Sequence, residues 1–478
     1  MATQPPNILW ICTDQQRHDT IGALGNPHIH TPSLDRLVAE GVAFTSAYCQ
    51  TPICTPSRAS FLTGRYPSHV GVNSNSNARF PDDAQLVTRT LADAGYDCGM
   101  AGKLHLSTVS GRVEPRPDDG YRVFRWSHHP RPETYWGVQH HAYHQWLEKQ
   151  GVNWFDYYPN RPWSEKVHAS VGAGIEPRYH QTTWCADEAI SFMSEPREGP
   201  WLMSVNPFDP HPQGAFFSAP REYLDKYDPA ALPGPHFRES DLAHQARLRN
   251  IDFQSTAARP EEYPAREMQA AYYASIELID AQVGRMLEAL ERSGQRENTV
   301  VIFMSDHGEM LGDHGLTRKG CRFYEGLAHV PLIISSPSRF RQGVRSGALV
   351  ELIDIVPTLL QLAGLDVPDD VQGQSLLPIL TGGSAADSHR DVVRCEYRDA
   401  LDMPGKSHAD MIFDGRYKLV VYHGTGLGEL FDLEEDPHEF DNLWDAAEAA
   451  GIKQKLLIRL FDDVVLAANE GQPRIANV

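Results

Sequence analysis

Cys54 opens the part of this sequence that is best suited to nucleophilic chemistry. It begins the run Cys54-Thr-Pro-Ser-Arg58, in which an arginine follows the cysteine by one helical turn. A thiol at the start of a helix and close to a guanidinium loses its proton more readily, and the thiolate is the reactive form. The alternative is a structural thiol, because most single cysteines are simply buried.

Two aspartates each follow an apolar, strand-like run, and they are the first candidates for metal ligands. Asp14 follows residues 8–13, and Asp306 follows residues 299–305. The carboxyl ends of parallel strands meet at one edge of an α/β sheet, where ligands bind. Two carboxylates there repel each other unless a cation lies between them, and oxygen ligands suit Ca²⁺, Mg²⁺ or Mn²⁺. The alternative is that each aspartate caps the helix or turn that follows it.

Several basic side chains are further candidates. Lys103 lies within the apolar stretch 98–104, and His105 follows it by two residues. His211 stands in Asp-Pro-His-Pro shortly after a strand-like run, and Lys319 lies downstream of the second aspartate. Such side chains can stabilise a developing negative charge or transfer a proton. The alternatives are solvated lysines and hydrogen-bonded core histidines.

Alternating strands and helices must hold these side chains in place. Runs of apolar and β-branched residues predict buried strands at 8–13, 201–206, 299–305 and 330–335. Apolar residues at three- and four-residue spacing predict a long amphipathic helix over 270–293, and shorter helices are expected at 32–40 and 85–94. The pattern predicts an α/β fold with helices on both faces of the sheet.

The pattern changes near residue 385. Short strands joined by turn residues are expected at 391–397, 410–413, 417–423 and 429–432, with a helix at 445–469. We therefore predict a main α/β domain over 1–385 and a smaller antiparallel α+β subdomain over 386–478.

Residues 112–184, within the first domain, are rich in tryptophan and histidine, Trp163 among them. We interpret them as an irregular insertion with a small aromatic core of its own. The functional alternative is that residues 112–184 form a wall of the substrate pocket, since loops on a rigid sheet often determine substrate specificity.

Composition restricts the kinds of partner. The formal net charge of −20 argues against nucleic acid or an anionic membrane surface, since both prefer basic proteins. No run approaches the roughly 18 apolar residues that a membrane span needs. Seven scattered cysteines and no visible signal-peptide pattern predict free thiols and a cytoplasmic location, or a periplasmic one if a leader has been removed. The tail 471–478 could pack on a second subunit of a homo-oligomer, although most such tails are mobile.

The longer string Cys54-Thr-Pro-Ser-Arg-Ala-Ser-Phe-Leu-Thr-Gly-Arg65 resembles the signature of the formylglycine-dependent sulfatases. The other motifs of that family have counterparts in the same order along nearly the whole chain: Thr-Asp14-Gln15, Lys103-Leu-His105, Asp-Pro-His211-Pro, Ser-Asp306-His307-Gly-Glu309, Lys319 and the closing Glu429-Leu-Phe-Asp432. The resemblance implies an alkaline phosphatase-like fold, with a mostly parallel central sheet. It also implies that a formylglycine-generating maturation enzyme oxidises Cys54 to formylglycine.

Carried over motif by motif, the resemblance assigns a role to each of these side chains. One divalent metal ion would be held by Asp14, Gln15, the modified Cys54, Asp306 and His307, with Ca²⁺ expected first and Mn²⁺ or Mg²⁺ as alternatives. The catalytic group would consist of Cys54, Arg58, Lys103, His105, His211 and Lys319. One hydroxyl of the hydrated aldehyde would attack sulfur while Asp306 accepts its proton and His211 protonates the leaving oxygen. His105 would take the proton of the second hydroxyl, which expels sulfate and restores the aldehyde.

Departures from the commonest sulfatase pattern bear on the metal and the substrate. Many sulfatases have a second aspartate at the position of Gln15 and an asparagine at that of His307. The Asp-Gln and Asp-His pairs found here look more like choline sulfatases and phosphonate monoester hydrolases, and the extra imidazole brings Mn²⁺ into consideration. Ser57 beside Arg58, and the Lys103 motif, favour a sulfatase.

The expected activity is hydrolysis of a small or medium sulfate ester. A phosphonate monoester or phosphodiester hydrolase is the alternative within the same superfamily. A non-catalytic binding protein with an unmodified Cys54 is the alternative from another class. The alcohol part of the ester could be a sugar, an aryl group or a quaternary ammonium compound, because the aromatic side chains of 112–184 suit each of them.

Overall fold

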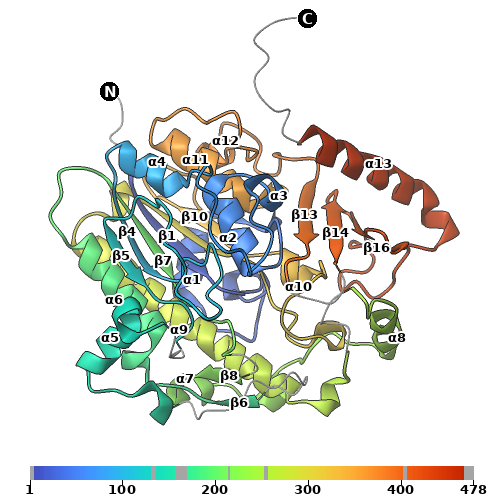
Figure 1. Cartoon of the computed structure of the whole chain (residues 1–478), viewed down its shortest axis with the longest axis horizontal. Coiled ribbons are helices and arrows are strands. Elements are labelled where there is room, and N and C mark those ends of the chain that lie inside the picture. Colours follow the sequence, from blue (N-terminus) through green and yellow to red (C-terminus); the bar gives the residue numbers. More distant parts are fainter. Residues whose placement is uncertain are drawn as a thin grey trace, which may run out of the picture.

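The structure is a computed structural model of the 478-residue chain. It describes residues 5–130, 136–157, 170–213, 216–251, 257–401 and 406–467. Trp163 and the tail 471–478, which the sequence assigned to an aromatic core and to a subunit contact, lie outside the described residues. Figure 1 shows a large sheet covered by helices, with a smaller sheet and the helix α13 at its side.

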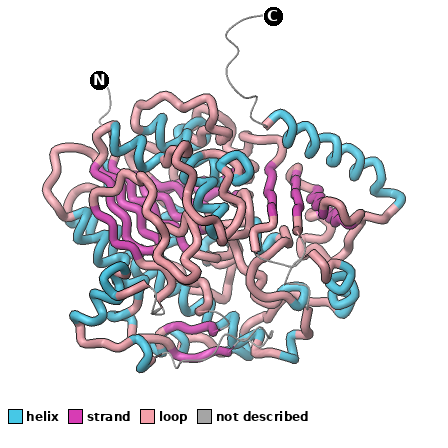
Figure 2. The backbone as a smooth tube through the Cα atoms, viewed as in Figure 1, coloured by secondary structure: helices cyan, strands magenta, loops and turns pink. Residues whose placement is uncertain are grey.

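An eight-stranded sheet forms the centre of the main domain (Figure 2). Its order is β11-β2-β10-β9-β1-β7-β4-β5, and within this sheet β10 runs antiparallel to both of its neighbours while the other pairs are parallel. The strands are β1 (Asn7–Thr13), β2 (Gly41–Phe44), β4 (Asp97–Gly102), β5 (Val123–Trp126), β7 (Trp201–Asn206), β9 (Thr299–Ser305), β10 (Leu332–Ser335) and β11 (Val344–Ser346). The predicted mostly parallel sheet is confirmed, and the strands predicted from apolar runs all lie in it.

Helices cover both faces of this sheet, as predicted. One face carries α1 (Pro32–Ala39), α6 (Gln181–Met193) and α9 (Ala265–Arg292), and the other carries α2 (Cys54–Thr63), α4 (Val87–Asp93) and α11 (Ile355–Leu362). Alternate side chains of β1 point to opposite faces of the sheet. Leu9 and Ile11 pack on the face of α1, α6 and α9, and Trp10 and Cys12 pack on the face of α2, α4 and α11. Burial on both faces explains why these strands are continuous apolar runs.

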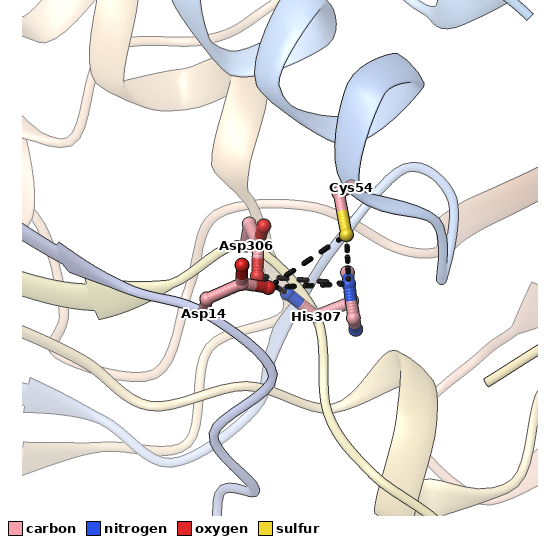
Figure 3. Close-up of side chains that lie close together, drawn as sticks. All are labelled: Asp14, Cys54, Asp306 and His307. Carbon is pink, nitrogen blue, oxygen red and sulfur yellow. Dashed lines mark hydrogen bonds and ion pairs between the residues drawn. The ribbon is translucent and has the colours of Figure 1, made fainter. Parts of the chain in front are cut away.

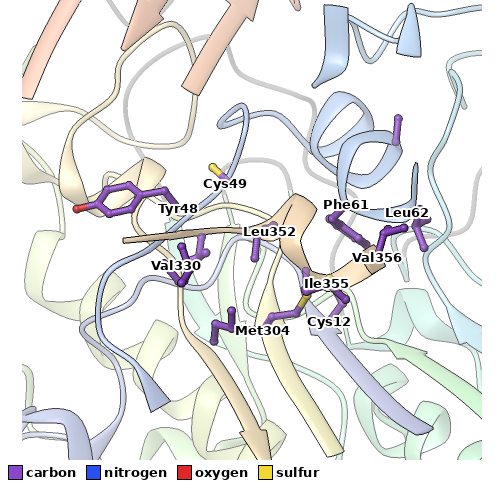
Figure 4. Close-up of a cluster of buried hydrophobic side chains, with 14 of the residues drawn as sticks. Cys12, Tyr48, Cys49, Phe61, Leu62, Met304, Val330, Leu352, Ile355 and Val356 are labelled. Atoms are coloured by element: carbon purple, nitrogen blue, oxygen red, sulfur yellow. The ribbon is translucent and has the colours of Figure 1, made fainter. Parts of the chain in front are cut away.

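The core on the second face fixes the helix that begins with Cys54. Figure 4 shows Phe61 and Leu62 of α2 close to Val356 of α11, above Cys12 of β1. Every residue of α2 is buried, so this helix has no solvent-exposed side. Its first residue is therefore held rigidly against the sheet.

Shorter elements complete the main domain. The remaining helices there are α3 (Pro67–Val70), α5 (Ala142–Lys149), α7 (Arg221–Leu224), α8 (Glu239–Arg247), α10 (Glu325–Ala328) and α12 (Leu377–Thr381). Two further pairs of strands are β3 (Ala47–Tyr48) with β12 (Val350–Glu351) and β6 (Ser170–Ala173) with β8 (Phe216–Ala219). Among the described residues, no helix combines the length and the apolar character that crossing a membrane requires.

An antiparallel sheet and a helix form the C-terminal part, as predicted. The strands follow the order β13 (Val393–Arg398), β14 (His408–Phe413), β15 (Tyr417–Tyr422) and β16 (Leu427–Asp432). The helix α13 (Ala450–Leu466) begins later than residue 445, because Asn442 Oδ1 accepts a hydrogen bond from Trp444 N and holds a turn there. Met411 and Val420 of this sheet belong to the same core cluster as Trp10. The division at 385/386 therefore stays a prediction.

Residues 112–184 are not a single irregular insertion, which corrects the interpretation of the sequence. β5 lies within this range and forms the edge of the main sheet, paired in parallel with β4 from Gly99–Val123 to Gly102–Trp126. The sequence Val-Phe-Arg-Trp is short and interrupted by the exposed Arg125, as is common at sheet edges, so it gave no apolar run. An aromatic cluster does exist, since the rings of Trp126, Trp136 and His141 contact one another.

Candidate active site

The predicted site residues gather at one edge of the main sheet. Asp14 directly follows β1, Lys103 follows β4 and Asp306 follows β9. Figure 3 shows Cys54, at the start of α2, facing the two aspartates and His307. One ligand atom from each of these four residues lies within 4.8 Å of the others. Segments far apart in the chain thus meet at the carboxyl ends of the strands.

The Cys54 thiol is buried among cationic groups. Its Sγ accepts a hydrogen bond from Lys319 Nζ at 2.7 Å and lies 3.2 Å from His307 Nε2. Burial alone would raise the pKa of this thiol, but Lys103, Lys319 and His307 outweigh burial and hold the pKa well below its ordinary value. Position 54 is therefore a place where the protein stabilises negative charge.

Two fully buried aspartates face the thiol. Asp14 Oδ1 lies 3.7 Å from Cys54 Sγ, and Lys103 Nζ donates to Asp14 Oδ2. Arg58, one turn into α2, donates from Nε to Asp306 Oδ2 at 2.9 Å. Burial and the charge on Cys54 would raise the pKa of Asp14, but nearby cations, Lys103 foremost, lower it to about 2. Asp14 is thus paired with Lys103 and Asp306 with Arg58, and Arg58 lies beside Asp306 rather than beside the thiol.

His307 is oriented as a metal-binding imidazole would be. Its Nδ1–H donates to Gly308 O at 2.8 Å, because a carbonyl can only accept, so Nε2 is the ring nitrogen that faces the site. Burial would lower the pKa of this ring, but Asp306 and Cys54 raise it above its ordinary value. This Nε2 lies 3.7 Å from Asp306 Oδ1 and 3.9 Å from Asp14 Oδ1. A carbonyl on the second nitrogen is the usual way in which proteins orient a metal-binding imidazole.

The donor set fits the implied divalent ion. Asp14 and Asp306 offer carboxylate oxygens, His307 offers one nitrogen, and Gln15 brings an amide oxygen to their side. Oxygen donors with a single imidazole suit Ca²⁺, Mg²⁺ or Mn²⁺ better than soft or tetrahedral zinc sites. The fit rests on the converging acids and on the orientation of the His307 ring.

A buried glutamate fixes the side chain of Gln15. Gln15 Nε2 donates to Glu309 Oε2, and Gln15 Oε1 accepts from Lys319 Nζ at 2.9 Å. Glu309 Oε1 also accepts from Leu311 N at 3.1 Å. The sequence assigned no role to Glu309, although it closes the Ser-Asp-His-Gly-Glu motif. Its carboxylate sets which end of the Gln15 amide faces the site.

The exit of β4 places Lys103. Gly102 has a φ of +111°, and Lys103 N donates to Asn206 O at 2.8 Å. A Cβ on Gly102 would lie 2.0 Å from Asn206 O, so only glycine allows this close approach. Burial would lower the pKa of Lys103, but Asp14 and Cys54 raise it above its ordinary value. The ammonium is therefore charged although it is buried.

Gly102→Ala is expected to lower the free energy of unfolding by about 1–3 kcal/mol and to reduce kcat, because the added methyl group must displace Asn206 or the backbone beside Lys103. Chemical denaturation measures the first effect and steady-state kinetics the second. Gly95→Ala is the matched control, since Gly95 has a φ of +95° but nothing within 4 Å of the added Cβ. Equal effects of the two substitutions on kcat would contradict the positioning role of Gly102.

His105 approaches Cys54 from the loop after β4, and its backbone is held by a carboxylate. His105 N and Leu106 N donate to Glu114 at 2.9 and 2.8 Å, and Trp126 Nε1 donates to the same group at 2.6 Å. The His105 side chain interacts with the thiol, and burial followed by Lys103 lowers its pKa to about 4. The ring is therefore neutral near pH 7. The sequence missed Glu114, since nothing distinguishes this residue from other loop carboxylates.

His211 lies at a more open part of the site, because its side chain is only partly buried. Its Nδ1–H donates to Pro212 O at 2.7 Å, and its ring interacts with Cys54. Burial and then Lys319 lower the pKa of His211 below its ordinary value. The predicted site residues are therefore all brought together around position 54.

Two further side chains support the start of α2. Asn75 Oδ1 accepts from Thr55 N at 3.0 Å, which satisfies an amide that the helix itself leaves unpaired. Ser57 Oγ donates to Asp306 O at 2.6 Å and ties the helix to the end of β9. Nothing in the sequence marks Asn75, because the contact joins the first turn of α2 to a loop 20 residues further along the chain.

A second group of His18, Glu325 and His329 does not have the geometry of a metal site, although its ligand atoms lie close together. The two imidazoles are stacked at 3.8 Å with an interplanar angle of 4°, so their in-plane lone pairs run parallel and do not converge. Glu325 accepts from Lys418 Nζ at 2.8 Å and from His329 Nδ1 at 2.7 Å. Its charge is thus already balanced by the lysine.

Comparison with known proteins agrees with this geometry. The sulfatase family profile matches residues 6–365, and a profile described as N-sulphoglucosamine sulphohydrolase, C-terminal, matches residues 312–464. An arylsulfatase from Clostridium perfringens is 32% identical over 461 residues, covering 93% of this chain and 91% of that protein. An N-acetylglucosamine-6-O-sulfatase from Bacteroides thetaiotaomicron is 27% identical over 534 residues, covering 98% and 88%. The crystal structure of a phosphonate monoester hydrolase from Agrobacterium radiobacter has a TM-score of 0.80 at 27% identity, covering 97% of this chain and 96% of that one.

Proposed function

Because this chain belongs to the sulfatase family, we propose that it hydrolyses a sulfate monoester with formylglycine, made from Cys54, as the nucleophile. The observation that carries the proposal is the setting of the Cys54 side chain. It lies beside the candidate metal ligands Asp14 and His307 and accepts a hydrogen bond from Lys319. A hydrated aldehyde at this position would lie beside the carboxylate of Asp14 and the ammonium group of Lys319.

One divalent ion would be held by Asp14, Gln15, the modified Cys54, Asp306 and His307, with Ca²⁺ as the first expectation and Mn²⁺ or Mg²⁺ as alternatives. When bound, such an ion supplies Lewis-acid chemistry and withdraws charge from a sulfate oxygen. The nitrogen ligand keeps Mn²⁺ in consideration. Metal analysis of protein purified without chelators would identify the ion.

Two side chains are placed to accept protons. Asp306 would take the proton of the hydroxyl that attacks sulfur, as the new sulfur–oxygen bond forms and the bond to the alcohol oxygen breaks. His105 would take the proton of the second hydroxyl, so that the carbonyl re-forms and sulfate leaves with the bonding electrons. A pKa of about 4 keeps the His105 ring neutral and able to accept a proton near pH 7.

Two cations would stabilise the sulfate group, and a third would orient the aldehyde. Lys319 donates to the Cys54 thiol and Lys103 donates to Asp14 beside it, and both would face the charge that develops on the sulfate and leaving oxygens. Arg58 donates to Lys103 O at 3.0 Å, and its other terminal nitrogen, which has no hydrogen bond among the described residues, lies 4.0 Å from Asp14 Oδ2. We assign Arg58 to orienting the hydrated aldehyde.

His211→Ala is expected to lower kcat for alkyl sulfates by roughly 100-fold, and for 4-nitrophenyl sulfate by less than about tenfold, because only a poor leaving group needs a proton donor. The Nδ1–H of His211 is committed to Pro212, so donation from Nε2 requires the imidazolium form, which a bound sulfate anion favours. Steady-state kinetics on both esters measure the difference. His28→Ala, at an exposed histidine, is the control, and an equal loss on both esters would remove His211 from the role of acid.

A phosphonate monoester or phosphodiester hydrolase is the second candidate, and the high structural similarity to such an enzyme is the observation that favours it. Sulfur and phosphorus esters present similar tetrahedral anions but differ in charge. The test is a parallel assay of an aryl sulfate, an aryl phosphonate monoester and a phosphodiester on protein whose aldehyde has been confirmed by mass spectrometry. A dominant phosphonate rate would overturn the first choice.

The remaining partners follow from the same proposal. A formylglycine-generating maturation enzyme must act on Cys54, and an unmodified thiol in protein from the natural host would favour a non-catalytic binding protein. Among the candidate alcohols, the relative named as an N-acetylglucosamine-6-O-sulfatase makes a sulfated sugar the first choice. The cytoplasmic location and a homo-oligomer remain predictions.

A further inference from the structure

The segment after β5 brings a second histidine next to His105. Trp126 pairs with Gly102 at the ends of β5 and β4, and Ser127 N donates to Gly102 O at 2.9 Å. The next residue, His128, therefore lies beside the Lys103–His105 loop. Its ring meets the ring of His105 edge-on, with centroids 4.4 Å apart and an interplanar angle of 86°. Since His105 contacts Cys54, the His105 ring connects His128 to the reacting position.

His128 is buried with both ring nitrogens unsatisfied. Its side chain is only 5% exposed, and neither Nδ1 nor Nε2 has a hydrogen-bond partner within the described parts of the chain. His105 Nδ1 is in the same state. Buried polar atoms are nearly always paired, so three such atoms together indicate a place that a ligand or water fills.

The surroundings of His128 restrict what it can bind. Phe208 and Trp136 lie near it, with ring centroids 6.1 and 5.8 Å away, and the ring of His129 lies at 5.3 Å. Burial, together with His105 and Lys103, holds the pKa of His128 well below its ordinary value. The ring is therefore neutral near pH 7, with one nitrogen that donates and one that accepts.

We propose that His128 recognises a hydroxyl group on the alcohol part of the substrate, next to the carbon that carries the sulfate. A hydroxyl both donates and accepts, so it can satisfy a neutral imidazole, whereas an aryl ring or a quaternary ammonium group can satisfy neither nitrogen. The substrate class is then a sulfated sugar or cyclic polyol with a free hydroxyl beside the ester. This inference rests on the proposed sulfatase function and narrows it.

The test compares two sulfate esters that differ by one hydroxyl: trans-1,2-cyclohexanediol monosulfate and cyclohexyl sulfate. His128→Phe keeps the ring size but removes both polar nitrogens. It is expected to lower kcat/KM for the diol ester by roughly 10- to 100-fold and to change that for cyclohexyl sulfate by less than about twofold. Dividing kcat/KM of the variant by that of the wild-type enzyme, separately for each ester, removes the difference in intrinsic reactivity between the two esters. His128→Asn, which can still donate and accept, is expected to recover part of the lost rate on the diol ester.

An equal fall in kcat/KM on both esters would overturn the inference and indicate a structural role for His128. No fall in kcat/KM on either ester would also overturn it, because water alone would then fill the site. His128→Leu repeats the comparison if the phenylalanine variant fails to fold. His144→Phe is the matched control, because His144 is a buried neighbour in the same aromatic cluster whose Nε2 is already paired with Pro130 O at 2.7 Å. It should leave the discrimination between the esters intact. Failure of aldehyde-bearing wild-type protein to hydrolyse any sulfate ester would instead overturn the proposed function itself.

Discussion

Replacing Cys54 with alanine is expected to abolish hydrolysis of every ester, by roughly four orders of magnitude or more, because no other side chain can supply the aldehyde. The fold should survive. Removal of the thiol leaves Arg58 paired with Asp306 and Lys103 with Asp14, and Lys319 keeps its hydrogen bond to Gln15 Oε1. Initial rates on the best ester, with circular dichroism and a thermal melt of the same sample, measure both outcomes.

Cys185→Ala is the control for the Cys54 experiment. Cys185 is an equally buried thiol, but it lies in α6 within the other core cluster. Its replacement should leave turnover unchanged, and mass spectrometry of wild-type protein should find an aldehyde at position 54 and an intact thiol at 185. Substantial turnover by Cys54→Ala in well-folded protein would exclude the proposed nucleophile.

Loss of Asp306, a proposed metal ligand, is expected to reduce activity by roughly a thousandfold and to lower the metal content below one ion per chain. A Lewis acid supplies several kcal/mol of transition-state stabilisation, and Asp306 also holds Arg58 and the backbone of Gln15 and His307. Asp306→Asn keeps the shape but removes the charge. Metal analysis by mass spectrometry and kinetics after chelation and re-addition of Ca²⁺ or Mn²⁺ measure the effect.

Asp354→Asn separates metal loss from a general loss of stability. Asp354 is also fully buried and paired with an arginine, Arg390, and its other partners, His389 and the backbone amides of Glu351 and Gln374, are not site residues. It should lower the melting temperature while keeping the metal. If wild-type protein keeps full activity after complete removal of divalent ions, the metal hypothesis is wrong.

The sequence carried enough information to predict the sheet and most of the site. β1 and β9 are buried on both faces, so each is a continuous apolar run that ends at Asp14 or Asp306. The Cys54 signature is local, because one helix turn carries the thiol and Arg58. Motifs of this kind depend on short spacing, which a sequence displays directly.

The residues that hold the site from outside could not be predicted in the same way. Glu114 accepts from backbone amides earlier in the same connection between β4 and β5, and Asn75 accepts from the first turn of α2. Neither contact leaves a spacing or a periodicity in the sequence. β5 was missed because an edge strand with exposed residues lacks the apolar run that marked β1. The placement of His128 depends on that edge strand, so it too became visible only in three dimensions.

The burial of Cys54 bears on the order of events during synthesis. The side chain is 1% exposed, and a group that covers it, His307, lies 253 residues further along the chain. At ordinary rates of translation this separation corresponds to roughly 10 to 50 s. If Cys54 is oxidised as proposed, the oxidising enzyme must bind the extended segment around position 54 during that interval, because the finished protein buries the side chain. On this proposal, a cell that makes the chain faster than it oxidises the thiol would accumulate folded, inactive molecules that later addition of the maturation enzyme does not rescue.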